Sequence, residues 1–161
     1  MDMLNFELLE ANINSSRDMD LGPSVVRSPG YGVSMVLPRG WIAASVLGEV
    51  YAIESMLQKN GRVYVSGQNA SIADVRQSHA DTIDLGYMQL LPTSAPLIEG
   101  NKASMHCKVE GVGSHEVAYV TTIVTANNNA ITFVALYDEP VAVFFKDFIN
   151  KIAASVKDLS A

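Results

Sequence analysis

A histidine and three carboxylates in one short segment are the residue types best suited to chemistry. His79 lies among Asp74, Asp81 and Asp84, and an imidazole near carboxylates is typical of a general base or a metal site. In a helix over this segment, the aspartates project away from the face that holds the histidine. That face is otherwise apolar, with Ile72, Val75 and Ile83 at helical spacing. The spacing therefore favours a half-buried histidine between helix and sheet over a ligand or a catalytic base.

The single cysteine of the chain is next to a histidine. His106 and Cys107 are adjacent, so in a strand their side chains point to opposite faces and cannot form a nucleophile–base pair or chelate one metal. The sequence also contains no Cys-x-x-Cys or His-Glu-x-x-His spacing, no Gly-x-Ser-x-Gly elbow and no phosphate-binding glycine loop. We therefore expect no enzyme activity, no metal and no cofactor.

A tryptophan follows a tight turn and is a candidate for binding. Trp41 comes directly after Pro38-Arg39-Gly40, where an aromatic ring either plugs the end of the core or stands in a groove. The spacing favours a core position, and the groove interpretation makes Trp41 and Arg39, together with His79, the candidate binding residues. The seven methionines would form an adaptable binding surface if clustered on one face. Scattered filling of the core is the simpler interpretation.

Composition narrows the choice of partners and compartments. A chain of 161 residues with 48% hydrophobic and 17% charged residues can bury a core of its own. The net charge of −6, with no stripe of Lys and Arg, predicts that nucleic acid is not a partner. No signal peptide and no integral membrane segment is expected. If the chain is complete it is cytoplasmic; if a leader was removed, it is periplasmic or belongs to the envelope.

Turn residues divide the sequence into elements. Residues 1–29 are predicted to be a partly ordered arm, and residues 30–161 a single domain. The domain begins with a strand over 31–37. It continues with two strands, 49–57 and 62–67, that pair as a hairpin because Lys59-Asn60-Gly61 contains the Asn-Gly turn signal.

A helix and a second group of strands follow. Ser71 predicts the start of a helix that runs to about Leu85, with Gly86 as its C-terminal cap. After a connection containing Pro92 and Pro96, a three-stranded meander is predicted over 103–110, 116–126 and 131–137. An amphipathic helix opened by Pro140 closes the chain and docks on the sheet. The predicted fold class is α+β, with an antiparallel sheet of about six strands, hairpin plus meander, flanked by helices.

The order of these elements resembles a known superfamily. Leu37-Pro38-Arg39-Gly40-Trp41 and the closing helix with Phe148-Ile149 and Ser155-Val156 resemble the PsbP-like superfamily, over about residues 30–160. That superfamily also holds Mog-type Ran-binding proteins and bacterial DcrB-like domains. The resemblance implies an antiparallel sheet with flanking helices and a non-enzymatic role as extrinsic subunit, envelope lipoprotein, small-GTPase partner or chaperone for secreted effectors. DcrB-like proteins usually carry a leader or lipid anchor, and neither is visible here.

Three functions follow as expectations. The first is an adaptor or chaperone-like module that binds a protein segment with the sheet face or with a groove beside Trp41. The second is a small-molecule-binding or hydrolytic protein with a pocket between the sheet and the helix of His79. The third is a structural subunit of a larger assembly. A protein partner is expected in the first and third cases, and a homodimer is compatible with the sequence.

Overall fold

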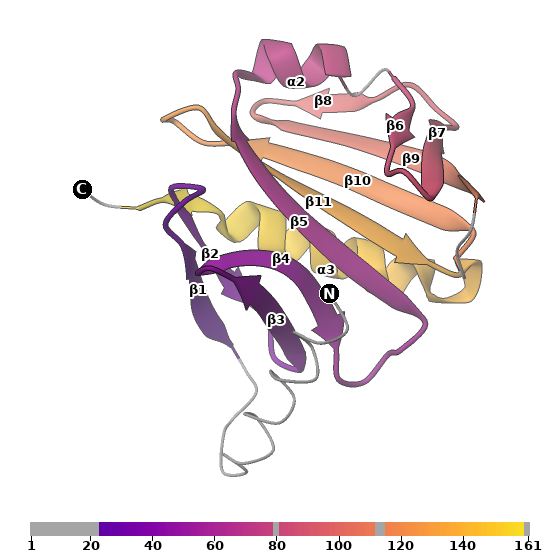
Figure 1. Cartoon of the computed structure of the whole chain (residues 1–161), viewed down its shortest axis with the longest axis horizontal. Coiled ribbons are helices and arrows are strands. Elements are labelled where there is room, and N and C mark those ends of the chain that lie inside the picture. Colours follow the sequence, from indigo (N-terminus) through magenta and orange to yellow (C-terminus); the bar gives the residue numbers. More distant parts are fainter. Residues whose placement is uncertain (1–22, 79–80, 112–114, 160–161) are drawn as a thin grey trace.

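The computed structural model of the chain describes residues 23–78, 81–111 and 115–159. Over these residues the fold is α+β, and the strands pair antiparallel. A nine-stranded sheet has the order β3-β4-β5-β11-β10-β9-β7-β6, and β8 also pairs with β9. A three-stranded sheet has the order β1-β2-β12. Figure 1 shows the large sheet with helix α3 behind it.

The element bounds are as follows. The first half of the chain contains β1 (Ser24–Ser28), β2 (Val33–Leu37), β3 (Trp41–Val46), β4 (Glu49–Ser55), β5 (Gly61–Asn69) and α2 (Ile72–Ser78). The second half contains β6 (Ile83–Asp84), β7 (Met88–Pro92), β8 (Leu97–Glu99), β9 (Lys102–Gly111), β10 (Val117–Val124), β11 (Asn129–Tyr137), the 3-10 turn η1 (Glu139–Val141), α3 (Ala142–Ser155) and β12 (Lys157–Asp158).

The predicted hairpin is present, and it has an additional strand beside it. β4 and β5 pair antiparallel, with Ala52 opposite Tyr64. β3 pairs with β4 through a turn at Leu47 and Gly48, whose φ values of 53° and 83° are those of a tight hairpin turn. β3 was not predicted from the sequence because leucine is not a turn signal at a position of positive φ.

The predicted helix is wrong in length. Its start is as expected: the Ser71 Oγ accepts from the Asp74 N–H, and the Asp74 Oδ2 accepts from the Ser71 N–H, both at 3.2 Å. In the described residues α2 spans Ile72–Ser78. It does not continue to Leu85, because Ile83 pairs with Leu90 in a β6–β7 hairpin. Gly86, with a φ of 88°, lies in that hairpin turn and does not cap the helix.

The predicted meander is confirmed and joins the first hairpin. β9, β10 and β11 pair in sequence order, and β11 pairs with β5 along its whole length, from Asn69 opposite Asn129 to Gly61 opposite Tyr137. The connection containing Pro92 and Pro96 is more regular than expected, because β7 and β8 both pair with β9. These short strands raise the strand number above the six that were predicted.

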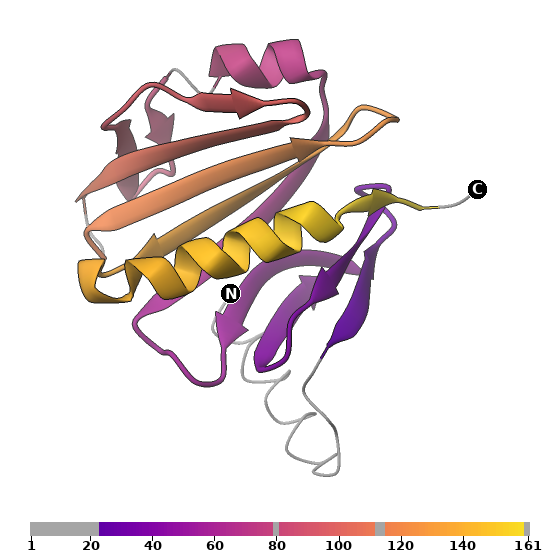
Figure 2. The same cartoon turned by 180° about the vertical axis from the view of Figure 1, so that it is seen from behind.

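The closing helix docks on the sheet as predicted. α3 buries Phe145, Phe148, Ile149 and Ile152 against the cores of the large sheet and of β2. Figure 2 shows α3 lying across this face. The opposite face carries a separate cluster around Leu90, Met105, Cys107, Val120 and Leu136. The two faces of the large sheet are therefore covered differently.

The N-terminal arm contains a strand within the part that the structure describes. Ser24–Ser28 form β1, which pairs with β2, and the buried Ser28 Oγ accepts from the Val50 N–H at 3.1 Å. The rest of the predicted arm, up to residue 22, lies outside the described residues. None of the described helices is long and apolar enough to span a membrane.

Candidate functional site

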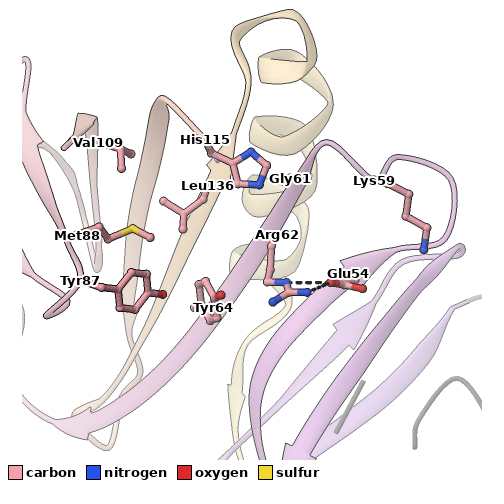
Figure 3. A pocket seen from close by; sticks show the side chains of 10 residues that line it. All are labelled: Glu54, Lys59, Gly61, Arg62, Tyr64, Tyr87, Met88, Val109, His115 and Leu136. Carbon is pink, nitrogen blue, oxygen red and sulfur yellow. Dashed lines mark hydrogen bonds and ion pairs between the residues drawn. The ribbon is translucent and has the colours of Figure 1, made fainter. Parts of the chain in front are cut away.

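A groove lies on the face of the large sheet opposite α3. It consists of two adjoining cavities, of about 300 and about 350 Å³, which share Tyr64 and Tyr87 in their linings. We call it the sheet groove and define it by the residues used below: Tyr51, Glu54, Lys59, Arg62, Tyr64, Ser66, Leu85, Tyr87, His115, Val134 and Leu136. Figure 3 shows the end that contains Arg62 and His115.

The floor and one wall of the groove come from neighbouring strands. Arg62, Tyr64 and Ser66 alternate along β5, so their side chains share one face of the sheet. β11 places Leu136 opposite Arg62 and Val134 opposite Tyr64. The long-range β5–β11 pairing therefore puts a tyrosine and an arginine beside an apolar floor.

The other wall is the turn of the β6–β7 hairpin. The Leu85 N–H donates to the Met88 carbonyl at 2.9 Å, and the Gly86 N–H donates to the Asp84 Oδ1 at 2.8 Å. These bonds fix the turn that carries Leu85 and Tyr87 into the lining. Tyr87 is 56% exposed and forms the rim of the groove.

An ion pair marks one end of the groove. The Arg62 Nε donates to the Glu54 Oε2 at 2.8 Å, and its Nη2 bonds to the same oxygen (Figure 3). Burial lowers the pKa of Arg62, but hydrogen bonds to Tyr64 and Glu54 outweigh it and raise the pKa above its usual value. Arg62 is therefore a permanent cation, and the exposed Lys59 adds a second positive charge at this end.

A histidine lies at the same end. The His115 Nδ1 is 3.5 Å from the Asp138 Oδ1, and the side chain is 21% exposed. The Nδ1 is buried and has no partner in hydrogen-bond geometry among the residues that the structure describes. His115 thus lies close to a carboxylate without a fixed bond to it, and the groove end combines an imidazole with Arg62 and Lys59.

Trp41 and Arg39, two of the three residues that the sequence nominated, lie outside the sheet groove. Trp41 is 7% exposed and stacks on Phe148 and Phe144, with ring centroids 3.6 and 5.4 Å away, so its ring closes the core on the α3 face. A cavity of about 230 Å³ lies beside it, and Arg39 is in the lining together with Lys151. His79 lies outside the described residues. Trp41 and Arg39 are thus together, but not in the sheet groove.

The histidine–cysteine pair is split between the two faces. Cys107 packs in the cluster opposite α3, where burial raises the pKa of its thiol to about 11. The His106 ring lies 4.9 Å from the ring of Tyr119; burial, followed by nearby Lys146, lowers its pKa. Among the described residues, no three His, Cys, Asp or Glu side chains are grouped to hold a metal ion.

The groove residues were not identified from the sequence, although one signal was present. Arg62, Tyr64 and Ser66 alternate with Val63 and Val65, a pattern that indicates a polar sheet face. Tyr87 follows a glycine that was assigned to a helix cap. No local pattern could show that β11 lies beside β5, because that pairing joins distant parts of the chain.

Comparison with known proteins supports the fold. The sequence matches no protein-family model and no curated protein. The structure is similar to the solution structure of cyanobacterial PsbP (CyanoP) from Synechocystis sp. PCC 6803, with a TM-score of 0.56 and 15% sequence identity. The similarity covers 86% of this chain and 94% of that chain. The predicted PsbP-like fold is therefore confirmed, as a fold.

Proposed function

We propose that this chain is a non-enzymatic accessory protein that binds an extended segment of another protein in the sheet groove. The observation that carries the proposal is a group of three tyrosines that lines one cavity of the groove. Tyr51, Tyr64 and Tyr87 lie with Leu85 and Val134 around one cavity of about 350 Å³. Tyrosine provides a large contact area at a low cost in conformational entropy, so it is frequent in protein-binding surfaces.

The architecture favours recognition by side chains. β5 and β11 both have neighbours on each side, so a ligand in the groove cannot add a strand to their backbones. A bound segment would lie across the tyrosine rings and the apolar floor of Val134 and Leu136. Its polar groups would meet the end that holds Arg62 and Lys59.

Two further observations support a role without catalysis. The raised pKa of Cys107 keeps its thiol protonated and poorly nucleophilic, and the residue packs among Met88, Leu90 and Met105. The PsbP-like fold is compatible with an accessory role. That this chain has such a role is part of the proposal.

Peptide display tests the proposal. A displayed library of unstructured peptides taken from protein sequences would be selected for binding to the immobilised full chain. The same selection would be made with a Tyr64→Ala/Tyr87→Ala double variant and with Leu97→Ala as the control. Leu97 is 58% exposed, close to the 56% of Tyr87, but lies in β8 outside the groove. We expect peptides that bind the wild type and the control and are lost on the double variant. Equal recovery on all three proteins, or no recovery, would refute the proposal.

A second candidate function rests on the Arg62 end of the groove. Its volume of about 300 Å³ is at the lower limit of small-molecule sites, and its lining combines Arg62, Lys59 and His115. A small carboxylate or phosphate compound would fit this set of charges. The pocket predicted between the sheet and the His79 helix is a different place, because no residue of α2 lines the groove. Thermal stabilisation by small anions that is lost in Lys59→Ala would favour this candidate over segment binding.

A further inference from the structure

We infer that residues 4–10 of this chain dock in the cavity beside Trp41 of the same chain, with Phe6 as the apolar anchor. This cavity of about 230 Å³, the Trp41 cavity, is separate from the sheet groove, so the inference does not rest on the proposed function. Three observations lead to it: the aromatic and cationic lining of the cavity, the place where the chain enters the described fold, and the composition of the residues that come before.

The Trp41 cavity is lined by stacked aromatic rings. The rings of Trp41 and Phe148 are inclined by 12° with centroids 3.6 Å apart, and the ring of Phe144 lies 5.4 Å from that of Trp41. Phe144 is only half-buried, so part of its ring is accessible to a ligand, and aromatic side chains pack favourably on such rings. A cavity of about 150 Å³ holds a benzene ring. The Trp41 cavity is larger and therefore has room for a phenylalanine side chain.

The rim of this cavity combines an apolar residue with a net positive charge. Leu57 is 84% exposed, and its Cδ1 would lie 3.9 Å from a Cβ placed at Gly40. Leu57 thus continues the apolar surface beside the cavity. Arg39 and Lys151 are exposed in the lining and outnumber its one acid, Asp147. The cavity therefore suits an apolar side chain that is accompanied by carboxylates.

The chain enters the described fold at the edge of this cavity. Ser24, the first residue of β1, is opposite Leu37 in the β1–β2 pairing, and the next residue, Pro38, lines the cavity. The Cα atoms of Ser24 and Pro38 are therefore within roughly 10 Å of each other. Residues 11–23 would connect the docked segment to Ser24, and a linker of this length without fixed structure spans about 20 Å on average. The segment is thus held near the cavity at a high effective concentration.

The residues that come before have the matching composition. The first 22 residues carry a net charge of −4, out of −6 for the whole chain. Between residues 4 and 10, apolar residues are combined with acids: Leu4, Phe6, Leu8 and Leu9 with Glu7 and Glu10. Phe6 is the one aromatic residue among the first 22, so we assign its ring to the aromatic lining. The neighbouring carboxylates then meet the positive rim.

The test places a nitroxide in this segment of the isotopically labelled full chain and records NMR spectra of dilute samples. The nitroxide is attached at Asn5→Cys. Cys107 is 1% exposed, so the nitroxide reacts with the introduced thiol. Trp41, the single tryptophan, gives one indole N–H signal. We expect the nitroxide to broaden this signal together with the amide signals of Arg39 and Lys151, relative to the same sample with the nitroxide reduced.

Two pairs of variants test the anchor and the charge. Phe6→Ala should remove most of the broadening, and Ile13→Ala, which truncates an apolar residue outside the docked segment, should leave it unchanged. Lys151→Glu should lower the ratio of docked to free segment about two- to tenfold, because it replaces a surface attraction by a repulsion. Lys157→Glu makes the same change of net charge at an exposed residue outside the cavity lining and should have no effect. The dispersion of each spectrum verifies that the variant is folded.

Several outcomes would overturn the inference. One is a Trp41 signal that the nitroxide leaves unchanged, and another is an equal effect of Phe6→Ala and Ile13→Ala. An equal effect of the two lysine variants would mean that the net charge of the chain, and not the cavity, governs the docking. Nitroxide-labelled chains that broaden the Trp41 signal of separate, isotopically labelled chains just as strongly would show docking on a second copy.

The result is independent of the proposed function. The side chains of Tyr64 and Tyr87 do not line the Trp41 cavity, so the Tyr64→Ala/Tyr87→Ala variant should show unchanged broadening, and either idea can fail alone. A docked segment would fill the cavity that Trp41 and Arg39 line. An external partner would then bind these two residues only by displacing the segment.

Discussion

Replacing Gly61 with alanine tests how the first hairpin is packed against the closing helix. The backbone of Gly61 is not among those with positive φ. A Cβ at this position would lie 2.5 Å from the Cε2 of Phe145 and 2.9 Å from the carbonyl oxygen of Leu136. Phe145 is fully buried and stacks on Tyr137, with ring centroids 5.7 Å apart. The glycine is thus needed for close packing, and not for the Asn-Gly turn that the sequence predicted.

The size of the effect follows from these contacts. Overpacking a well-ordered core costs about 1–3 kcal/mol, and the lower backbone entropy of alanine returns roughly 0.5–1 kcal/mol. We expect Gly61→Ala to lower the free energy of unfolding by about 1–2 kcal/mol. For a chain of this length that corresponds to a fall in Tm of roughly 2–8 °C.

Urea unfolding, followed by the fluorescence of the single tryptophan, measures the change. Phe145→Leu removes the ring atoms that a Cβ at Gly61 would meet, so Gly61→Ala should cost at least about 1 kcal/mol less in that background. Gly48→Ala is the matched control. Its Cβ would meet nothing within 4 Å, but its φ is 83°, so its cost is backbone strain that Phe145→Leu should not relieve. If Gly61→Ala costs the same with and without the Phe145 ring, the packing explanation is wrong.

Three other predictions concern Trp41, Cys107 and Ser71. Trp41 is stacked in the core, so iodide should quench the native protein much less than the urea-unfolded chain; equal quenching would place the ring in solvent. Burial raises the pKa of Cys107 from 9.0 to about 11, so the unfolded chain loses this proton first. Stability should therefore fall as the pH rises from about 9 to 11, by roughly 1 kcal/mol per pH unit from this group, and unfolding of Cys107→Ala should show a smaller slope. Tyr137, whose pKa burial raises to about 12, acts in the same direction and remains in that variant. Ser71→Ala removes the cap of α2 and should cost about 1 kcal/mol in urea unfolding; no change would mean that the cap is dispensable.

The sequence correctly predicted those elements whose ends are marked by turn residues or by a helix-opening proline. The meander was visible because Asn127, Asn128 and Asn129 separate two apolar runs, and the closing helix was visible from Pro140 and its periodic phenylalanines. Gly86 was wrongly predicted to cap a helix because a glycine with positive φ suits a helix cap and a hairpin turn equally well. The pairing of Ile83 with Leu90 shows that Gly86 lies in a hairpin turn. The sequence pattern did not indicate this pairing.

The candidate site was harder to predict than the fold. The binding residues nominated from the sequence were chosen by type. Trp41 and Arg39 line a separate cavity, where Trp41 stacks on Phe144 and Phe148, and their role in binding stays a prediction. The groove instead depends on which residues of β5 and β11 face each other, and that register is set by the assembled sheet. The type of a residue on β5 does not show which residue of β11 lies opposite it.

The pairing of β5 with β11 also has a consequence for how the protein folds. β4 with β5, and β9 with β10 and β11, are joined by short connections, so each group can form early. Gly61 and Tyr137, which are separated by about half of the chain, must then meet, and contacts between residues so far apart in sequence form slowly. The wall with Tyr64 and the floor with Val134 come together only at that step. A ligand of the groove would thus recognise only chains that have completed folding, and it would stabilise this junction against opening.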